Sequence, residues 1–459
     1  MKKSSLSARI AAYTMQFSLE SVPKEVAEHA KLMIIDSFGG AVAAYYLEHA
    51  ESARKVASDF GSRPESTLWG TKQRAGMADA VLANAALIHG MDYDDTHVGS
   101  VVHPSASVVS TAFTVGEATK ASGRDILEAI ICGYEIIIRL GLAARGGFHD
   151  RGFHGTGIVA PFAAACVAAK LLRLPQAVLV HALGICGSQA AALQEFLHDG
   201  SWVKKMHPGW GSHSAIYALM LAKGGVTGPY EVFEGSYGLY QSHLGTVDGV
   251  EEAFADLGQK WLTLEIAIKR YPCCHMIHSF SDCVFELLAK YQFTARDIKE
   301  IECRIEKRCY HIVCSPELAK KRPTSDYGMR FSLPYIVAMS ILNGKLSPAE
   351  INEQYMNNLA VVELIDKIKC VEDEMVKEPG HFPGWVKITL NDGAVYHKEQ
   401  KYERGAAENP IDEQDIIAKY KENALINLPQ EKVARLLDQV FKLDKLSHIR
   451  ELLENLMIE

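Results

Sequence analysis

The chain has 459 residues, of which 48% are hydrophobic and 23% charged, and 48 Lys and Arg against 56 Asp and Glu give a net charge of −8. This composition excludes disordered and fibrous proteins, and the length predicts two or three domains because one core stops growing near about 250–300 residues. The acidic balance argues against a nucleic-acid partner, which needs a clustered basic excess, but permits an anionic substrate held by a few local cations.

The sequence up to about Tyr240 predicts one helix after another. Apolar residues recur at helical spacing over residues 26–38, behind Pro23, which suits a first helical turn. Residues 125–144 and 175–193 are apolar on nearly all sides, as helices are in the middle of a large bundle. The simplest interpretation of these segments is core packing.

The pattern changes near Leu264, after which strands are predicted. Residues 298–309 alternate apolar and polar side chains, which indicates a strand. Residues 386–390 and 395–402 flank Asn391-Asp392-Gly393, and this Asp-Gly turn predicts a β-hairpin.

Helical patterns surround these strands and set the predicted architecture. Residues 331–343 and 348–360 read as helices, and three short amphipathic helices follow Gly405. We therefore predict a mainly α protein with an α+β second domain. The large all-helical domain is discontinuous, with residues 1–266 and 405–459, and the smaller α+β lid domain has residues 267–404.

The densest polar cluster lies in a loop that follows His89. Its members are Asp92, Asp94, Asp95, Thr96, His97 and His103. Carboxylates and imidazoles this close displace one another's pKa values, as in acid–base sites. Because Pro104 follows His103, we expect that imidazole at a helix N-terminus, where it is held as a neutral base. A purely structural knot of caps and salt bridges is the alternative.

A metal site is a rival interpretation of the same residues. Asp and His together could bind a divalent ion, but the His-Glu-x-x-His and EF-hand spacings are absent from the sequence. Cys273, Cys274, His275 and His278 suggest zinc, yet adjacent cysteines ligate one tetrahedral ion poorly and no second Cys/His pair completes the set. We expect no metal.

The second cluster lies among glycines between Gly147 and Gly157. It contains His149, Asp150, Arg151 and His154, and the glycines would let the backbone approach a ligand closely. A solvated connection between helices is the equally simple alternative.

The third cluster is basic and precedes Pro208-Gly209, which predicts a turn. It contains Lys204, Lys205 and His207. A lysine near apolar neighbours can bind a carboxylate or donate a proton, although such a charge pair is usually only solvated.

The fourth cluster lies at the junction into the α+β part. Lys269 and Arg270 give two positive charges directly before the cysteine- and histidine-rich string. Because ligand clefts concentrate between domains, a basic binding site is the better interpretation of this segment.

Together the four clusters describe a cleft with His and Asp for acid–base chemistry and several cations. Nucleotide-binding glycine patterns, a Walker pattern and a Gly-x-Ser-x-Gly nucleophile turn are absent from the sequence. What fits is cofactor-free proton chemistry next to carboxylates, in which cations hold the substrate and stabilise an enediolate-like intermediate.

In order and spacing these segments resemble the MmgE/PrpD family, which includes 2-methylcitrate dehydratase, cis-aconitate decarboxylase and iminodisuccinate epimerase. The matching segments are Asp92–Thr96, His103–Ser105, Gly152–His154, Lys204–Gly209, Lys269–Pro272 and Arg330–Tyr335. The resemblance covers essentially the whole chain. It implies a helical domain with an α+β lid, a homodimer and no cofactor.

The resemblance also implies roles for individual residues. His103 would be the main acid–base group, and Asp92 and Thr96 would orient the substrate or the imidazole. Lys204 and Lys269 would bind substrate carboxylates, and Lys204 could also protonate or stabilise the intermediate. The resemblance adds His154 to the catalytic set and His207, Cys274 and His275 to the substrate-binding set.

The substrate is expected to be a small polycarboxylate, and the reaction to be dehydration of a citrate-like hydroxy acid such as 2-methylcitrate. Two positions depart from the family pattern: His97 stands where dehydratases tend to carry Trp, and Cys274 where decarboxylases place His. Epimerisation or decarboxylation of a related acid, such as iminodisuccinate or cis-aconitate, therefore stays open.

The remaining expectations concern the compartment and the other histidines. The N-terminal segment contains no run of about 7–15 apolar residues, which a secretory signal would need. No apolar stretch of the sequence approaches the ~18–20 residues of a membrane-spanning helix. We expect a cytoplasmic protein without a membrane partner. His29, His49 and His448 are expected at the surface.

Overall fold

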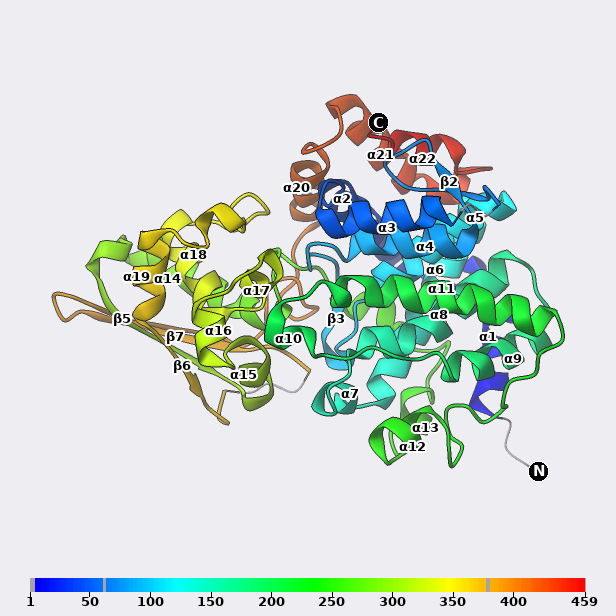
Figure 1. Cartoon of the computed structure of the whole chain (residues 1–459), viewed down its shortest axis with the longest axis horizontal. Helices are drawn as coiled ribbons and strands as arrows, with labels where there is room; N and C mark the ends of the chain where they lie inside the picture. The colour runs from blue at the N-terminus through cyan, green and yellow to red at the C-terminus, as the bar shows by residue number, and fades with distance from the viewer. Residues whose placement is uncertain (1–4, 61–62, 377–379, 459) are drawn as a thin grey trace.

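The computed structural model describes residues 5–60, 63–376 and 380–458, and it has a helical part and a smaller part built on a four-stranded sheet (Figure 1). This confirms the predicted mainly α fold with an α+β second part. The helices of nine or more residues in the large part before residue 224 are α1 (Leu6–Gln16), α2 (Lys24–Ala43), α3 (Glu48–Asp59), α4 (Met77–Ile88), α5 (Pro104–Thr119), α6 (Gly123–Ala143), α8 (Gly155–Leu171), α9 (Gln176–Gly187) and α11 (Val203–Lys223).

The apolar helices predicted from the sequence form the centre of this bundle. Every residue of α8 except Lys170 is buried, and α6 and α11 pack against it. The helix predicted over residues 175–193 ends at Gly187, so the prediction is wrong for residues 188–193. The chain leaves the helix because its backbone pairs elsewhere: the Ala192 carbonyl accepts from the His154 N–H at 3.0 Å.

The C-terminal helices α20 (Glu413–Ala424), α21 (Gln430–Phe441) and α22 (Arg450–Asn455) lie against the N-terminal helices (Figure 1). Lys419 of α20 forms a buried ion pair with Asp36 of α2 at 2.7 Å. Tyr420 lies close to Gly39 of α2: a Cβ added at Gly39 would be 3.2 Å from the Cα atom of Tyr420. The C-terminal helices therefore share the hydrophobic core of the helical part, while the predicted boundaries at residues 266 and 405 stay a prediction.

The α+β part contains a sheet of strand order β6-β5-β7-β8. Its strands are β5 (Ile298–Ile305), β6 (Ile368–Glu372), β7 (Gly384–Leu390) and β8 (Val395–Gln400), and only the β5–β6 pair is parallel. The predicted hairpin is confirmed as β7–β8, and α14 (His278–Tyr291) packs across both of its strands.

Two predictions in the α+β part are wrong at their ends. The strand predicted over 298–309 stops at Ile305, because Glu306 caps α15 (Lys307–Val313) by accepting from the Cys309 N–H at 3.2 Å. The helix predicted over 348–360 is a series of turns before α19 (Leu359–Asp366).

The turns before α19 have a local cause. The side chains of Asn352 and Asn358 accept from the N–H groups of Gln354 and Ala360 at 2.9 and 3.0 Å. Each of these two hydrogen bonds caps a new turn, so together they compete with the hydrogen bonds of a continuous helix. The second helix predicted there, residues 331–343, is confirmed as α18 (Leu333–Asn343).

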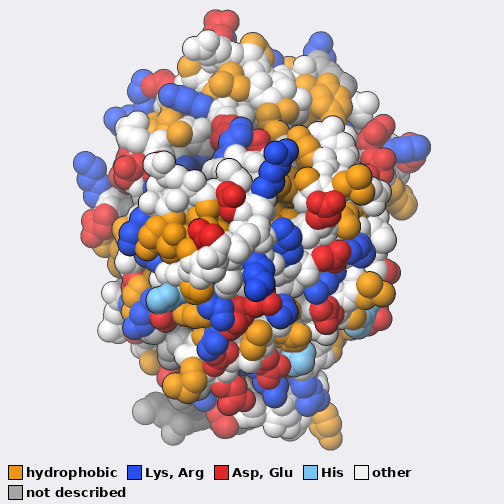
Figure 2. Space-filling model, turned by 90° about the vertical axis from the view of Figure 1, so that its left-hand side faces the viewer, with side chains coloured by type: hydrophobic (Ala, Val, Ile, Leu, Met, Phe, Trp, Pro, Cys, Tyr) orange, Lys and Arg blue, Asp and Glu red, His pale blue; other side chains and the backbone are white. Residues whose placement is uncertain are grey.

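A two-stranded ribbon joins the two parts. β3 (Thr96–His97) pairs with β4 (Ile266–Ala267), so the aspartate-rich loop lies next to the chain that enters the α+β part. The outer end of that part carries Lys and Arg side chains interspersed with Asp and Glu (Figure 2). Among the described residues, no helix combines the length and apolarity that crossing a membrane requires.

Candidate active site

Asp92 lies at the centre of the site and connects three segments. Its Oδ1 atom accepts from Lys204 Nζ at 2.6 Å and lies 3.2 Å from Lys269 Nζ, which also donates to the Asp92 carbonyl at 2.8 Å. All three side chains are buried. Asp92 follows α4, Lys204 belongs to the first turn of α11 and Lys269 follows β4, so one carboxylate holds these segments together.

The electrostatics of the site favour the charged forms of Asp92 and Lys269. Burial alone would raise the pKa of Asp92, but the ammonium groups of Lys204 and Lys269 hold it well below its usual range. Burial would likewise lower the pKa of Lys269, but Asp92 and Asp94 raise it above its ordinary value. Since two ammonium groups share the Asp92 carboxylate, the cluster is suited to receive a further carboxylate from a substrate.

His103 lies directly before α5, as its position before Pro104 predicted. Its Nδ1 atom is 2.8 Å from the carbonyl oxygen of Asp95, and a carbonyl only accepts, so Nδ1 carries the proton and Nε2 the lone pair. Thr96 Oγ1 lies 3.1 Å from the same Nδ1 atom. Burial, followed by the charges of Lys269 and Lys204, holds the pKa of His103 well below its ordinary value. The ring is therefore a neutral base.

Two other imidazoles stand beside His103. The ring centroids of His89 and His154 lie 4.9 and 6.0 Å from that of His103. Nδ1 of His89 contacts the Asp94 carboxylate at 2.8 Å, and Nδ1 of His154 contacts His207 Nδ1 at 3.1 Å. Both Nε2 atoms are buried without a hydrogen-bond partner. Burial is the main cause that lowers the pKa of both rings, so the array is neutral.

Asp95 contacts both His103 and the first turn of α5. Its carboxyl group accepts from the N–H of Ser105 at 3.1 Å and contacts Ser105 Oγ at 2.5 Å, so it caps α5. Burial, followed by the charge of Asp94, raises the pKa of Asp95 to about 8. A protonated Asp95 is therefore part of the framework that fixes the loop and His103.

The α+β part contributes the opposite wall. Cys274 and His275 follow Lys269, and neither ring nitrogen of His275 has a hydrogen-bond partner. Burial is the main cause that raises the pKa of Cys274 to about 11, so its thiol is protonated. The ring of Phe331 lies 5.0 Å from Lys204 Nζ and shields that cation from solvent.

These walls enclose a cavity of about 50 Å³, which has room for a few water molecules only. Of the residues predicted from the sequence, Asp92, Thr96, His103, His154, Lys204, Lys269, Cys274 and His275 line it. The two parts of the fold thus bring together residues that are far apart in the sequence.

The turn predicted at Pro208-Gly209 is wrong, because α11 continues through it to Lys223. Gly209 lies against α4, where a Cβ would be 2.6 Å from the carbonyl oxygen of Leu82. Close packing of α11 on α4 therefore replaces the turn, although Pro208 removes one backbone hydrogen bond of the helix. The same packing brings Lys204 to the loop that contains Asp92.

Comparison with protein families decides the relationship. The MmgE/PrpD N-terminal domain model matches residues 8–249 and the MmgE/PrpD C-terminal domain model matches residues 271–444. The chain belongs to the MmgE/PrpD family.

Several characterised members of the MmgE/PrpD family are similar to this chain over most of its length. The cis-aconitate decarboxylase of Aspergillus terreus is 26% identical and covers 98% of this chain and 96% of its own. That of Homo sapiens is 26% identical, covering 92% of this chain and 88% of its own. The 2-methylcitrate dehydratase of Salmonella typhimurium is 22% identical and covers 80% of both chains.

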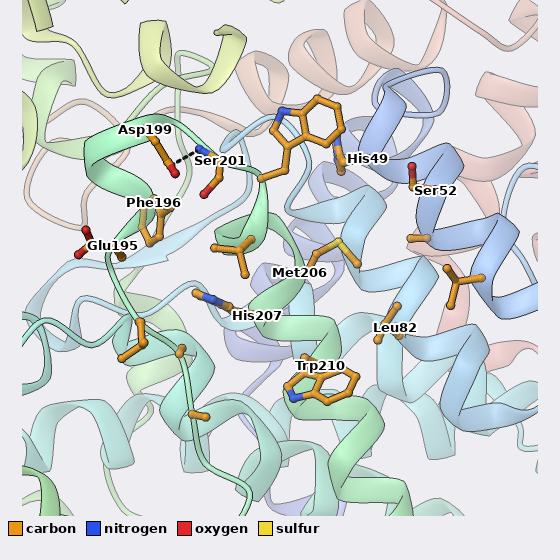
Figure 3. A pocket seen from close by; sticks show the side chains of 17 residues that line it. His49, Ser52, Leu82, Glu195, Phe196, Asp199, Ser201, Met206, His207 and Trp210 are labelled. Carbon is orange, nitrogen blue, oxygen red and sulfur yellow. Dashed lines mark hydrogen bonds between the residues drawn. The ribbon is translucent and has the colours of Figure 1, made fainter. Parts of the chain in front are cut away.

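His207 is the predicted site residue that does not line the MmgE/PrpD cavity. It lies behind His154 and lines an apolar groove of about 770 Å³ on the other side of Phe196 (Figure 3). His49, expected at the surface, is 4% exposed and lines the same groove, with Lys205 Nζ 3.5 Å from its Nδ1. That expectation is wrong, because α3 packs His49 against α4 and α11.

The structure adds residues to the site that the sequence analysis did not assign a role. His149 and Gln194 line the cavity, and His89 lies directly behind it with its ring stacked on that of His154. The glycine-rich segment indicated His149 as a candidate. Gln194 follows the end of α9, and its N–H donates to the Gly152 carbonyl at 2.9 Å, a pairing that no local pattern indicates.

Among the described residues, two groups of side chains in the site have the geometry to hold a cation. In one, a ring nitrogen each of His89, His103 and His154 lies within 4.8 Å of the others, and in the other the ligand atoms of His89, Asp92 and Asp94 do so. Imidazoles whose other nitrogen is hydrogen-bonded are typical metal ligands. The nearby ammonium groups of Lys204 and Lys269 oppose a cation there, so the site is better suited to an anion.

Proposed function

We propose that this chain is a lyase that acts on a small citrate-like polycarboxylate by His and Lys acid–base chemistry. One observation carries the proposal: a neutral His103, with its lone pair on Nε2, shares an enclosed cavity with the Lys204–Asp92–Lys269 triad. A base next to fixed cations is what proton abstraction alpha to a carboxylate requires.

Dehydration is the reaction that this geometry supports best. In it, His103 Nε2 takes the proton alpha to a substrate carboxylate, whose developing enediolate is stabilised by Lys269 and Lys204. The carbon–carbon double bond forms as the β-hydroxyl leaves. Lys204 donates a proton to this hydroxyl, which departs as water. Thr96 Oγ1, next to His103 Nδ1, holds the imidazole in this orientation.

Decarboxylation is the second candidate, and the relatives favour it. Cis-aconitate decarboxylases match 92–98% of this chain, whereas 2-methylcitrate dehydratases match 59–84%. In that reaction the carbon–carboxylate bond breaks, its electrons form the new double bond, and the displaced double bond takes up a proton, which Lys204 can supply. Cys274 lies in the cavity wall at the position where the decarboxylase pattern has a histidine, with His275 beside it, and this departure argues against decarboxylation.

A substrate panel tests the proposal. The purified chain is incubated with 2-methylcitrate, citrate, cis-aconitate and iminodisuccinate, and products are followed by NMR. Formation of an unsaturated acid from a hydroxy acid supports dehydration, and release of carbon dioxide from cis-aconitate supports decarboxylation. Deuterium uptake without loss of water or carbon dioxide would contradict a lyase and support epimerisation.

We also propose that the chain forms a homodimer through the exposed face of α11. Val203, Trp210, Tyr217 and Leu221 are 44–52% exposed at helical spacing, and the apolar groove of Figure 3 opens beside them. A contiguous apolar surface of this kind marks a protein interface. Light scattering of the wild type is expected to give a dimer and Trp210→Glu a monomer; a monomeric wild type would contradict the proposal.

A further inference from the structure

A second cavity, of about 340 Å³, adjoins the catalytic cavity at the seam between the two parts. The two share the wall residues Val101, His149, Met276 and Phe382. The helical part contributes Arg145 to the second cavity, and the α+β part contributes Arg308. We call this second cavity the vestibule.

Arg308 joins the two parts across the vestibule. It belongs to α15, and its Nε and Nη2 atoms bind the two carboxylate oxygens of Asp150 in α7 (Gly147–Asp150) at 2.8 and 3.0 Å. The Nη1 atom lies over Gly146, where a Cβ would be 2.5 Å away. The guanidinium is therefore fixed against the backbone of the helical part, at the edge where α15 faces α7 (Figure 1).

The catalytic cavity is smaller than the proposed substrate. A space of about 50 Å³ cannot admit an acid with six carbons, so its walls have to move for the substrate to enter. The groove on the far side of Phe196 has apolar walls that offer little to an anion, apart from His49 and His207. The vestibule presents arginines instead, and it shares four wall residues with the catalytic cavity.

We propose that the vestibule is a carboxylate-binding entry site in which Arg308 exchanges the Asp150 carboxylate for a carboxylate of the incoming substrate. The exchange breaks one bidentate contact and makes another of the same kind, so the guanidinium stays paired throughout. Since the contact given up is one of those that join the two parts, binding of the anion also weakens the seam on the side of the vestibule. This inference rests on the proposed polycarboxylate substrate.

The charges around the vestibule suit this exchange. Arg308 and Asp150 are 44% and 46% exposed, and an exposed ion pair is weak enough to be replaced. Arg145 is 59% exposed and pairs with Glu252, so this second guanidinium can bind an anion in competition with that carboxylate. Among the described residues of the wall, Glu306 is the acidic one, and its carboxylate already accepts from the Cys309 N–H at the start of α15.

The test measures binding of propane-1,2,3-tricarboxylate, which has no hydroxyl group to eliminate, by calorimetry to the full chain and to three variants. Arg308→Gln is expected to raise Kd about tenfold and to weaken its dependence on salt. Asp150→Asn is expected to leave Kd unchanged or to lower it, because it removes the competing carboxylate.

Arg322→Gln is the matched control. Arg322 pairs with Asp366 at 2.7 Å at a similar exposure, but that pair lies within the α+β part and away from both cavities, so Kd is expected to stay at the wild-type value. Wild-type Kd in Arg308→Gln, or equal weakening in Arg308→Gln and Asp150→Asn, would overturn the inference while the proposed function stands. A wild type that binds no tricarboxylate would overturn both.

Discussion

Lys204 Nζ lies 2.6 Å from Asp92 Oδ1, and both side chains are buried. This contact ties the first turn of α11 to the loop after α4, and Lys269 adds a second ammonium group to the same oxygen atom at 3.2 Å. The positive charge that would hold a substrate carboxylate is therefore built into the framework of the fold, so the site should be preorganised.

Replacing Asp92 by Asn should be strongly destabilising. The change leaves the ammonium groups of Lys204 and Lys269 buried without their carboxylate, which is expected to lower the free energy of unfolding by about 3–5 kcal/mol in urea denaturation. Asp366→Asn removes the exposed partner of Arg322 and should cost less than about 1 kcal/mol. A similar small change for both variants would contradict the role given to Asp92.

His103→Gln should lower kcat by about 10²–10⁴-fold, because it removes the base but keeps a polar side chain in the cavity. The Lys204–Asp92–Lys269 triad is untouched, so KM should change little. His181, a histidine of α9 that contacts the Gly228 carbonyl away from the cavity, supplies the control His181→Gln. Steady-state kinetics showing equal losses in both variants would refute the assignment.

Asp95 should make the stability of the protein depend on pH. Its folded pKa of about 8 lies above the ordinary value of 3.8, so its contribution is complete below pH 3.8 and is lost as pH rises through 8. Asp95→Asn stays neutral at every pH. The free energy of unfolding of the wild type, relative to this variant, should therefore fall by at least about 1 kcal/mol from pH 5 to pH 8. A difference that is constant over this range would mean that Asp95 is ionised throughout.

Gly209→Ala tests whether close packing of α11 places Lys204. The new Cβ would lie 2.6 Å from the Leu82 carbonyl oxygen, so overpacking should cost about 1–3 kcal/mol of unfolding free energy and lower kcat. A Cβ at Gly40 of α2 would lie 3.8 Å from the carbonyl oxygen of Ile88, which is an ordinary van der Waals contact. Gly40→Ala should be neutral or stabilising by up to about 1 kcal/mol, because Ala is the better helix former.

Local patterns predicted those features whose causes are local. Pro104 placed His103 at the start of a helix, and Asp392-Gly393 predicted the β7–β8 hairpin. Helical spacing predicted α6 and α18.

Features that depend on distant contacts were missed. The sequence Pro208-Gly209 is typical of a turn, but packing of Gly209 against Leu82 of α4 keeps this segment in the helix. The sequence also indicated His207 as a substrate-binding residue, but His154 lies between His207 and the cavity. The neutrality of Asp95 arises from its burial beside Asp94, which a loop sequence does not reveal.

The most direct measurement of the central claim is proton exchange in D₂O. The wild type is incubated with the substrate found in the panel, and the ¹H NMR signal of the hydrogen alpha to its carboxylate is followed together with product formation. The account predicts that the wild type eliminates water as that signal is lost, and that His103→Gln does so about 10²–10⁴-fold more slowly. Turnover by His103→Gln at the wild-type rate would contradict it.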